Sequence, residues 1–142
     1  MQYNDMFNIL VDLLGTPREN EASLKAMLRH FYVMGVPNIE RVGTGKRHDY
    51  SFEDFREMYI AMTMSHMGLF PYKIVKILKA IRDFDNSPYP VWERHAVIRH
   101  KESVALFTDE QLSDMLSKWA GSISFNLAVI NTRASMYKDL FS

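Results

Sequence analysis

The chain has 142 residues, and its 17 basic and 17 acidic side chains give a formal net charge of zero. Hydrophobic residues make up 47% of the sequence, which supports a packed core and argues against intrinsic disorder. Cysteine is absent, which excludes disulfides, thiolate catalysis and thiolate metal ligands. No apolar run is long enough to predict a transmembrane helix, and no basic leader precedes Asp5, so we expect a cytoplasmic protein.

Two amphipathic helices are predicted in the first 35 residues. The first covers 3–14 and ends at Gly15-Thr16-Pro17, a typical helix stop. The second runs from about residue 21 to residue 34, and Gly35 is a natural residue to follow its last turn. Apolar side chains recur at helical spacing in the first helix: Phe7, Leu10, Val11 and Leu14.

A short basic hairpin is predicted next. Residues 39–42 and 47–50 are typical of two short strands, joined by Gly43-Thr44-Gly45. The two glycines provide the positive φ angles that tight hairpin turns require. Basic side chains flank the turn on both strands: Arg41, Lys46 and Arg47.

Two further helices are predicted after the hairpin. Ser51, with Asp54 three residues later, resembles a capping box, so a helix should begin here and end at Gly68. Pro71 suits the first turn of the next helix. This order of elements predicts a winged helix-turn-helix domain over 1–84: a helix, a basic wing, a capped helix and a short helix.

A proline-containing turn with Pro88 and Pro90 suggests a boundary. We expect 85–142 to form a small α+β segment, so the predicted fold class is α+β and mostly helical. A core of about 55 residues is marginal by itself, so this segment should pack on the winged domain or on a second copy. Its predicted elements are strands at 91–99, 103–107 and 122–129, a helix from the Thr108/Gln111 capping pair to about Gly121, and a last helix at about 131–141.

Residues 24–82 resemble the DNA-binding domain of the MerR superfamily of regulators. Leu28-Arg29-His30-Phe31-Tyr32-Val33-Met34-Gly35 is similar to the Leu-Arg-Tyr-Tyr-x-x-x-Gly with which that family often ends its recognition helix. Residues 45–54 match the Gly-x-Arg-x-Tyr-Ser-x-x-Asp of its wing with one extra residue. The Gly68 break before an isoleucine-rich helix also follows the family pattern.

The resemblance implies that Lys25 and Arg29 enter or border the major groove of double-stranded DNA, while basic wing residues contact the flanking backbone. The residues themselves favour phosphate contact, because Arg forms forked hydrogen bonds to phosphate and Lys acts as a mobile charge. Arg29 has a structural alternative, pairing with Glu40 or Asp54. The full candidate DNA-binding set is Lys25, Arg29, Arg41, Thr44, Lys46, Arg47 and Tyr50.

The sequence therefore predicts a cytoplasmic, nucleoid-associated, DNA-binding transcriptional regulator. Residues 1–82 carry 11 basic and 9 acidic side chains, against 6 and 8 in 83–142, so a dimerisation or partner-binding role suits the second half better than DNA contact. No catalytic motif is present, and no enzyme, cofactor or metal site is predicted. Two alternatives stay open: an architectural factor of the excisionase or packaging type, and a protein-interaction adaptor, which Ala26 and Met27 favour because they cannot hydrogen-bond bases.

Overall fold

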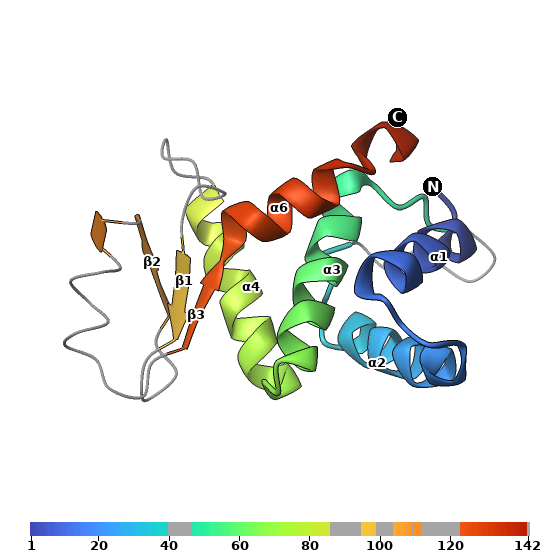
Figure 1. Ribbon diagram of the computed structural model, residues 1–142, viewed down its shortest axis with the longest axis horizontal. Coiled ribbons are helices and arrows are strands. Elements are labelled where there is room, and N and C mark those ends of the chain that lie inside the picture. Colours follow the sequence, from blue (N-terminus) through green and yellow to red (C-terminus); the bar gives the residue numbers. More distant parts are fainter. Residues whose placement is uncertain (40–46, 86–94, 99–103, 109, 112–122, 142) are drawn as a thin grey trace.

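The fold is mostly helical, with one small sheet at the far end from the N-terminus (Figure 1). The computed structural model describes residues 1–39, 47–85, 95–98, 104–108, 110–111 and 123–141. Its helical elements are α1 (Tyr3–Leu14), η1 (Arg18–Asn20), α2 (Glu21–Val33), α3 (Phe52–His66), α4 (Pro71–Asp85), α6 (Leu127–Ser135) and η3 (Lys138–Phe141). Its strands are β1 (His95–Ile98), β2 (Val104–Phe107) and β3 (Ile123–Asn126).

The first two helices begin and end close to where the sequence predicts them. Gly15 ends α1 in the left-handed conformation at φ 61°, and its N–H donates to the Asp12 carbonyl oxygen at 3.1 Å. Gly35 follows α2 at φ 89°. Both predicted helix ends are confirmed. Glycine adopts these positive φ angles without the steric cost that other residues incur.

The predicted capping box at the start of α3 is confirmed. The Asp54 N–H donates to Ser51 Oγ at 3.1 Å, and the Ser51 N–H donates to Asp54 Oδ2 at 2.9 Å. These two bonds satisfy backbone donors that have no partner inside the helix. Gly68 separates α3 from α4, which begins at Pro71 as predicted.

Helix α3 is the centre of the core. In Figure 1 it lies between α1 and α2 on one side and α4 on the other, with α6 crossing its upper end. Three buried side chains of α6, Leu127, Ile130 and Ala134, belong to the same hydrophobic cluster as the buried residues of α1 to α4. The contact continues past α6 into η3, where the Phe141 ring centroid is 5.0 Å from that of Phe55. The C-terminal helix thus packs on the N-terminal helices.

The sheet is antiparallel, with strand order β2-β1-β3 and Ala96 opposite both Leu106 and Phe125. Strands β1 and β2 lie inside the predicted strand ranges. The predicted capping pair is also present, since the Gln111 N–H donates to Thr108 Oγ1 at 3.3 Å and Gln111 Oε1 accepts from the Thr108 N–H at 3.1 Å. Most of the helix expected after it lies outside the described residues.

The predicted strand over 122–129 is too long, and the last helix begins earlier than 131. Strand β3 stops at Asn126, whose Oδ1 accepts a hydrogen bond from the Val129 N–H at 3.2 Å and caps α6. An apolar alternation continued through Val129, but Leu127, Ile130 and Ala134 are spaced at helical intervals and all three are buried. The hydrogen bond from the Asn126 cap and the burial of these three side chains stabilise a helix more than the apolar alternation favours a strand.

The strand predicted over 47–50 is wrong. Residues 47–50 belong to no strand, and the Tyr50 N–H donates to the Met1 carbonyl oxygen at 2.8 Å instead. The wing turn, with Arg41, Thr44 and Lys46, lies outside the described residues. No helix in the described part of the chain is long and apolar enough to cross a membrane.

Candidate nucleic-acid interface

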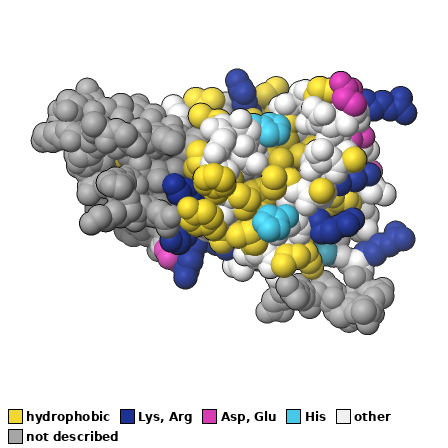
Figure 2. Space-filling view, turned by 90° about the horizontal axis from the view of Figure 1, so that it is seen from below, with side chains coloured by type: hydrophobic (Ala, Val, Ile, Leu, Met, Phe, Trp, Pro, Cys, Tyr) yellow, Lys and Arg dark blue, Asp and Glu magenta, His cyan; other side chains and the backbone are white. Residues whose placement is uncertain are grey.

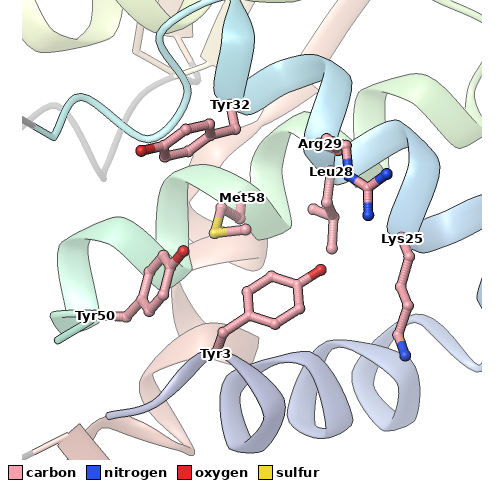
Figure 3. Close-up of a pocket in the computed structure, with 7 residues that line it drawn as sticks. All are labelled: Tyr3, Lys25, Leu28, Arg29, Tyr32, Tyr50 and Met58. Atoms are coloured by element: carbon pink, nitrogen blue, oxygen red, sulfur yellow. The ribbon is translucent and has the colours of Figure 1, made fainter. Parts of the chain in front are cut away.

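The structure brings three of the predicted DNA-binding residues around one pocket (Figure 3). Lys25 and Arg29 are exposed on α2, and half-buried Tyr50 comes from the segment before α3. We call this feature the tyrosine pocket; its volume is about 380 Å³. It is lined by Tyr3, Lys25, Leu28, Arg29, Tyr32, Tyr50 and Met58.

The base of the tyrosine pocket is apolar. Leu28 from α2 and Met58 from α3 are almost fully buried, with 2% and 3% exposure. Tyr3 of α1 packs beside Tyr50, with 6.1 Å between ring centroids. Two cationic side chains therefore border a hollow whose inner surface is hydrocarbon and aromatic ring.

Arg29 makes no hydrogen bond or ion pair with any residue that the structure describes. The alternative pairing with Asp54 does not occur, because Asp54 Oδ2 accepts from the Ser51 N–H and lies 3.1 Å from His48 Nε2. Glu40, the other alternative partner, lies outside the described residues. The Arg29 guanidinium is exposed, and no described residue occupies it.

Lys25 is partly held in place. Its Nζ lies 4.9 Å from the centroid of the Phe7 ring in α1, a cation–π geometry. In Figure 3 its ammonium extends toward α1, while the Arg29 guanidinium stays near α2. The two charges therefore spread along the edge of the pocket instead of meeting at one point.

Two tyrosines of the pocket were missed by sequence reasoning. Tyr32 follows Lys25 and Arg29 at i+7 and i+3, so helical spacing alone places it on the same face of α2. Tyr3 had no such signal, because it comes from another helix and reaches the pocket only through tertiary packing. Both add a phenol group to the predicted set.

The phenols of Tyr3 and Tyr50 stay protonated well beyond neutral pH. Burial raises the pKa of Tyr3 above its usual value, although nearby Arg29 partly lowers it. Burial also raises the pKa of Tyr50, and the neighbouring Tyr3, Tyr32 and Asp54 groups raise it further. At neutral pH these hydroxyls can donate hydrogen bonds to an anion without repelling it.

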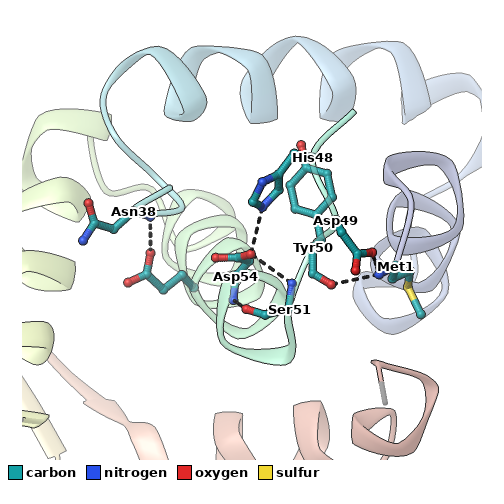
Figure 4. A network of polar contacts seen from close by, with 8 residues as sticks. Met1, Asn38, His48, Asp49, Tyr50, Ser51 and Asp54 are labelled. Carbon is teal, nitrogen blue, oxygen red and sulfur yellow. Dashed lines mark hydrogen bonds and ion pairs between the residues drawn. The ribbon is translucent and has the colours of Figure 1, made fainter. Parts of the chain in front are cut away.

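A polar network fixes the segment that carries Tyr50 (Figure 4). The His48 ring contacts Asp54 and packs edge-on against Tyr50, with ring centroids 4.6 Å apart. The α-amino group of Met1 pairs with the Asp49 carboxylate and donates to the Tyr50 carbonyl oxygen at 3.1 Å. These contacts connect the segment to Met1, just before α1, and to the first turn of α3.

Arg47 does not line the tyrosine pocket. It is exposed and borders a neighbouring hollow of about 390 Å³, which shares Tyr3 and Tyr50 with the tyrosine pocket. The three candidate basic residues that the structure describes, Lys25, Arg29 and Arg47, therefore lie on two hollows that meet at the Tyr3–Tyr50 pair. A ligand that contacts both Arg29 and Arg47 must extend across that pair.

The wider surface mixes cationic and apolar side chains. On the face drawn in Figure 2, hydrophobic side chains gather in the middle, and Lys and Arg side chains lie around and among them. Met67, Phe70 and Tyr72, around the turn between α3 and α4, are among the most exposed large hydrophobic side chains of the described chain. No group of three or more His, Asp or Glu residues suited to a metal ion occurs in the described part.

A scan against protein-family models, a search of curated proteins and a search of solved structures each returned no match to this chain. A function for this chain therefore rests on its own sequence and on the geometry and charge of the interface.

Proposed function

We propose that this chain is a DNA-binding transcription regulator of MerR-like winged helix-turn-helix type. Helix α2 and the basic wing over 39–50 contact double-stranded DNA, and the C-terminal half mediates dimerisation or partner binding. The observation that carries the proposal is the exposed Arg29 guanidinium, without a described partner and next to Lys25 and Tyr50.

The chemistry of these side chains suits a DNA backbone. Phosphate contacts set the position of a protein on DNA, and the Arg guanidinium forms the strong forked hydrogen bonds that a phosphate accepts. Neutral phenols at Tyr3 and Tyr50 add donors to the same surface. Because the whole chain is neutral, local clustering of these cations must supply the attraction.

Hydrogen bonds from α3 and α4 to the chain just after α2 help to fix the orientation of the helix that carries Lys25 and Arg29. Arg82 Nη2 donates to the Gly35 carbonyl oxygen at 3.0 Å, directly after α2, and also to Glu57 Oε2 at 2.6 Å. The Asn38 N–H donates to the same carboxylate oxygen at 3.1 Å. Helices α3 and α4 thereby hold the end of α2, which suits a helix that must enter a groove in a fixed orientation.

Self-association is proposed through the C-terminal half. Val129 on α6, Met136 directly after α6 and Leu140 on η3 are exposed by 49%, 78% and 59%. Val129 and Met136 are seven residues apart, so helical geometry places them on one side. A two-fold dimer would present two copies of α2 to a symmetric DNA site. Sedimentation at micromolar concentration tests this, and a strictly monomeric species rules it out.

Fluorescence anisotropy with mixed-sequence duplexes tests DNA binding. If all five predicted Lys and Arg contacts form, the logarithm of affinity should fall with the logarithm of salt concentration with a slope of about −4 to −5. Arg29→Ala and Arg47→Ala should each weaken binding to all sequences and reduce the slope by about 0.9. Lys79→Ala on α4, on the other side of α3, is the matched control and should change neither quantity.

One observation favours the adaptor alternative. Met67, Phe70 and Tyr72 are exposed by 59%, 64% and 48%, and the rings of Phe70 and Tyr72 stack with 6.2 Å between centroids. Exposed apolar groups of this kind often mark protein contacts. Absence of salt-dependent duplex binding by the wild-type chain would reject DNA binding and favour this alternative.

A further inference from the structure

We propose that the tyrosine pocket is a binding site for a small aromatic carboxylate. The inference goes beyond DNA binding, because the ligand is a small molecule held by both the apolar base and the cationic edge of the pocket. Only its effect on DNA, described below, rests on the proposed function.

The pocket has the size and lining of a small-molecule site. Its volume of about 380 Å³ lies within the range of about 300–1,000 Å³ that is usual for ligand pockets. Leu28 and Met58 form an apolar base, and the Met58 thioether suits contact with an aromatic ring. Tyr3, Tyr32 and Tyr50 surround that base with further aromatic surface (Figure 3). A flat ring is therefore the group that this interior accepts best.

The edge of the pocket specifies the charge of the ligand. Arg29 has no partner among the described residues, and its planar guanidinium matches the two oxygens of a carboxylate. In Figure 3 the Tyr3 hydroxyl points to the side of the pocket on which the Arg29 guanidinium lies. A carboxylate placed between them receives a charged fork from Arg29 and a neutral donor from Tyr3.

The two other hollows lack this combination. The hollow near the α1–α2 turn, of about 550 Å³, has Met27 and Met62 in its lining but no Lys or Arg. The hollow that contains Arg47 is lined otherwise by Gln2, Asn4, His48 and the two shared tyrosines, with no aliphatic base. Only the tyrosine pocket, among these three, joins a cation to an apolar base.

The aromatic lining is ordered before a ligand arrives. The Tyr3 ring stacks on Phe7 with 6.0 Å between centroids, and Tyr50 packs against His48, which Asp54 holds. A ligand that enters a preformed site loses less free energy to ordering side chains. The site therefore suits a ligand of modest size that makes few strong contacts.

Occupancy of the pocket should oppose DNA binding. A carboxylate on Arg29 neutralises a cation that the proposed function assigns to a DNA phosphate. The ligand would then act as an effector that releases the chain from DNA through direct competition.

Methyl NMR of the ¹³C-methionine-labelled full chain tests the site with 1-naphthoate as probe. The Met58 methyl signal should shift in a saturable manner, whereas Met27 and Met62, in the other hollow, should not. The neutral analogue 1-naphthalenemethanol should bind at least about tenfold more weakly, because it lacks the charge that Arg29 pairs with. Absence of a saturable Met58 shift at millimolar 1-naphthoate, or equal affinity for the alcohol, overturns the proposal.

A pair of variants assigns the charge. Arg29→Gln keeps most of the side chain, is exposed in the fold, and should weaken 1-naphthoate binding about tenfold. Lys79→Gln, on α4, should leave it unchanged. Equal binding by Arg29→Gln and wild type overturns the proposal. These readouts contain no DNA, so saturable binding at Met58 by a chain that binds no duplex would sustain the pocket and reject the proposed function alone.

Discussion

Arg82 on α4 and Glu57 on α3 form a two-pronged ion pair, from Nε to Oε1 at 2.5 Å and from Nη2 to Oε2 at 2.6 Å. Their side chains are exposed by only 26% and 18%, so neither charge is fully solvated. The pair also binds the chain after α2, through the Gly35 carbonyl oxygen and the Asn38 N–H. One contact therefore connects α2, α3 and α4.

Breaking this pair should destabilise the protein. Arg82→Ala removes both Arg82 hydrogen bonds from the Glu57 carboxylate and leaves it the one from the Asn38 N–H. We therefore expect a loss of about 2 kcal/mol in the free energy of unfolding. Urea denaturation followed by circular dichroism measures it. A double-mutant cycle with Glu57→Gln separates the pair from the individual side chains, and a coupling energy near zero would show that the pair is not stabilising.

The capping box should make Asp54 more important for stability than Ser51. Ser51→Ala removes one capping bond and should cost about 1 kcal/mol. Asp54→Ala removes the reciprocal capping bond and the contact with His48, so its cost should be larger. Thermal melts of both variants measure the difference. Glu53→Ala, in the same turn, is the matched control, and a loss at Glu53 equal to that at Asp54 would contradict this assignment.

Stability should fall at alkaline pH because two phenols, those of Tyr3 and Tyr50, are half-buried. The folded-state pKa values of Tyr3 and Tyr50 lie above the ordinary value of 10.0. Above pH 10 the unfolded chain therefore binds fewer protons than the folded chain, and the free energy of unfolding decreases as pH rises toward the folded-state values. Melting temperatures between pH 8 and 11 should show this decline, and Tyr50→Phe should make it shallower. An unchanged slope in Tyr50→Phe would exclude Tyr50 as a source.

The switch from strand to helix at Asn126 should depend on its side chain. Asn126→Ala removes the acceptor for the Val129 N–H and should cost about 1 kcal/mol. Asn126→Ser keeps a capping oxygen and should recover most of the loss. Chemical denaturation of the two variants distinguishes these outcomes, and equal losses would show that the cap does not stabilise α6.

Local signals in the sequence predicted the helices well. Apolar periodicity, Gly15, Gly35 and the Ser51/Asp54 pair are short-range features, and the structure confirms the helices that they indicate. After Asn126 the apolar alternation indicated a strand, whereas the spacing of Leu127 and Ala134 is that of a helix. The sequence alone did not show that these two side chains reach the core. Burial of Leu127 and Ala134 in the core that α3 shares favours the helix.

The candidate site was harder to predict because its parts are far apart in the chain. Lys25, Arg29 and Tyr50 were chosen from charge and pattern, and the structure places them on one pocket. Tyr3 was missed because it approaches Tyr50 only when α1 packs in the fold. The strand expected over 47–50 failed for a related reason: the Tyr50 backbone bonds to Met1, a partner that no pattern near residue 50 reveals.

The return of α6 across α3 has a consequence for how the chain can be divided. Phe141 lies close to both Phe52 and Phe55, with centroid distances of 6.1 and 5.0 Å, at the first turns of α3. A fragment cut at residue 85 would expose these rings to water just where the helix after the wing begins. Such a fragment should aggregate or fold incompletely, so DNA-binding assays need a polypeptide that includes the C-terminal helix.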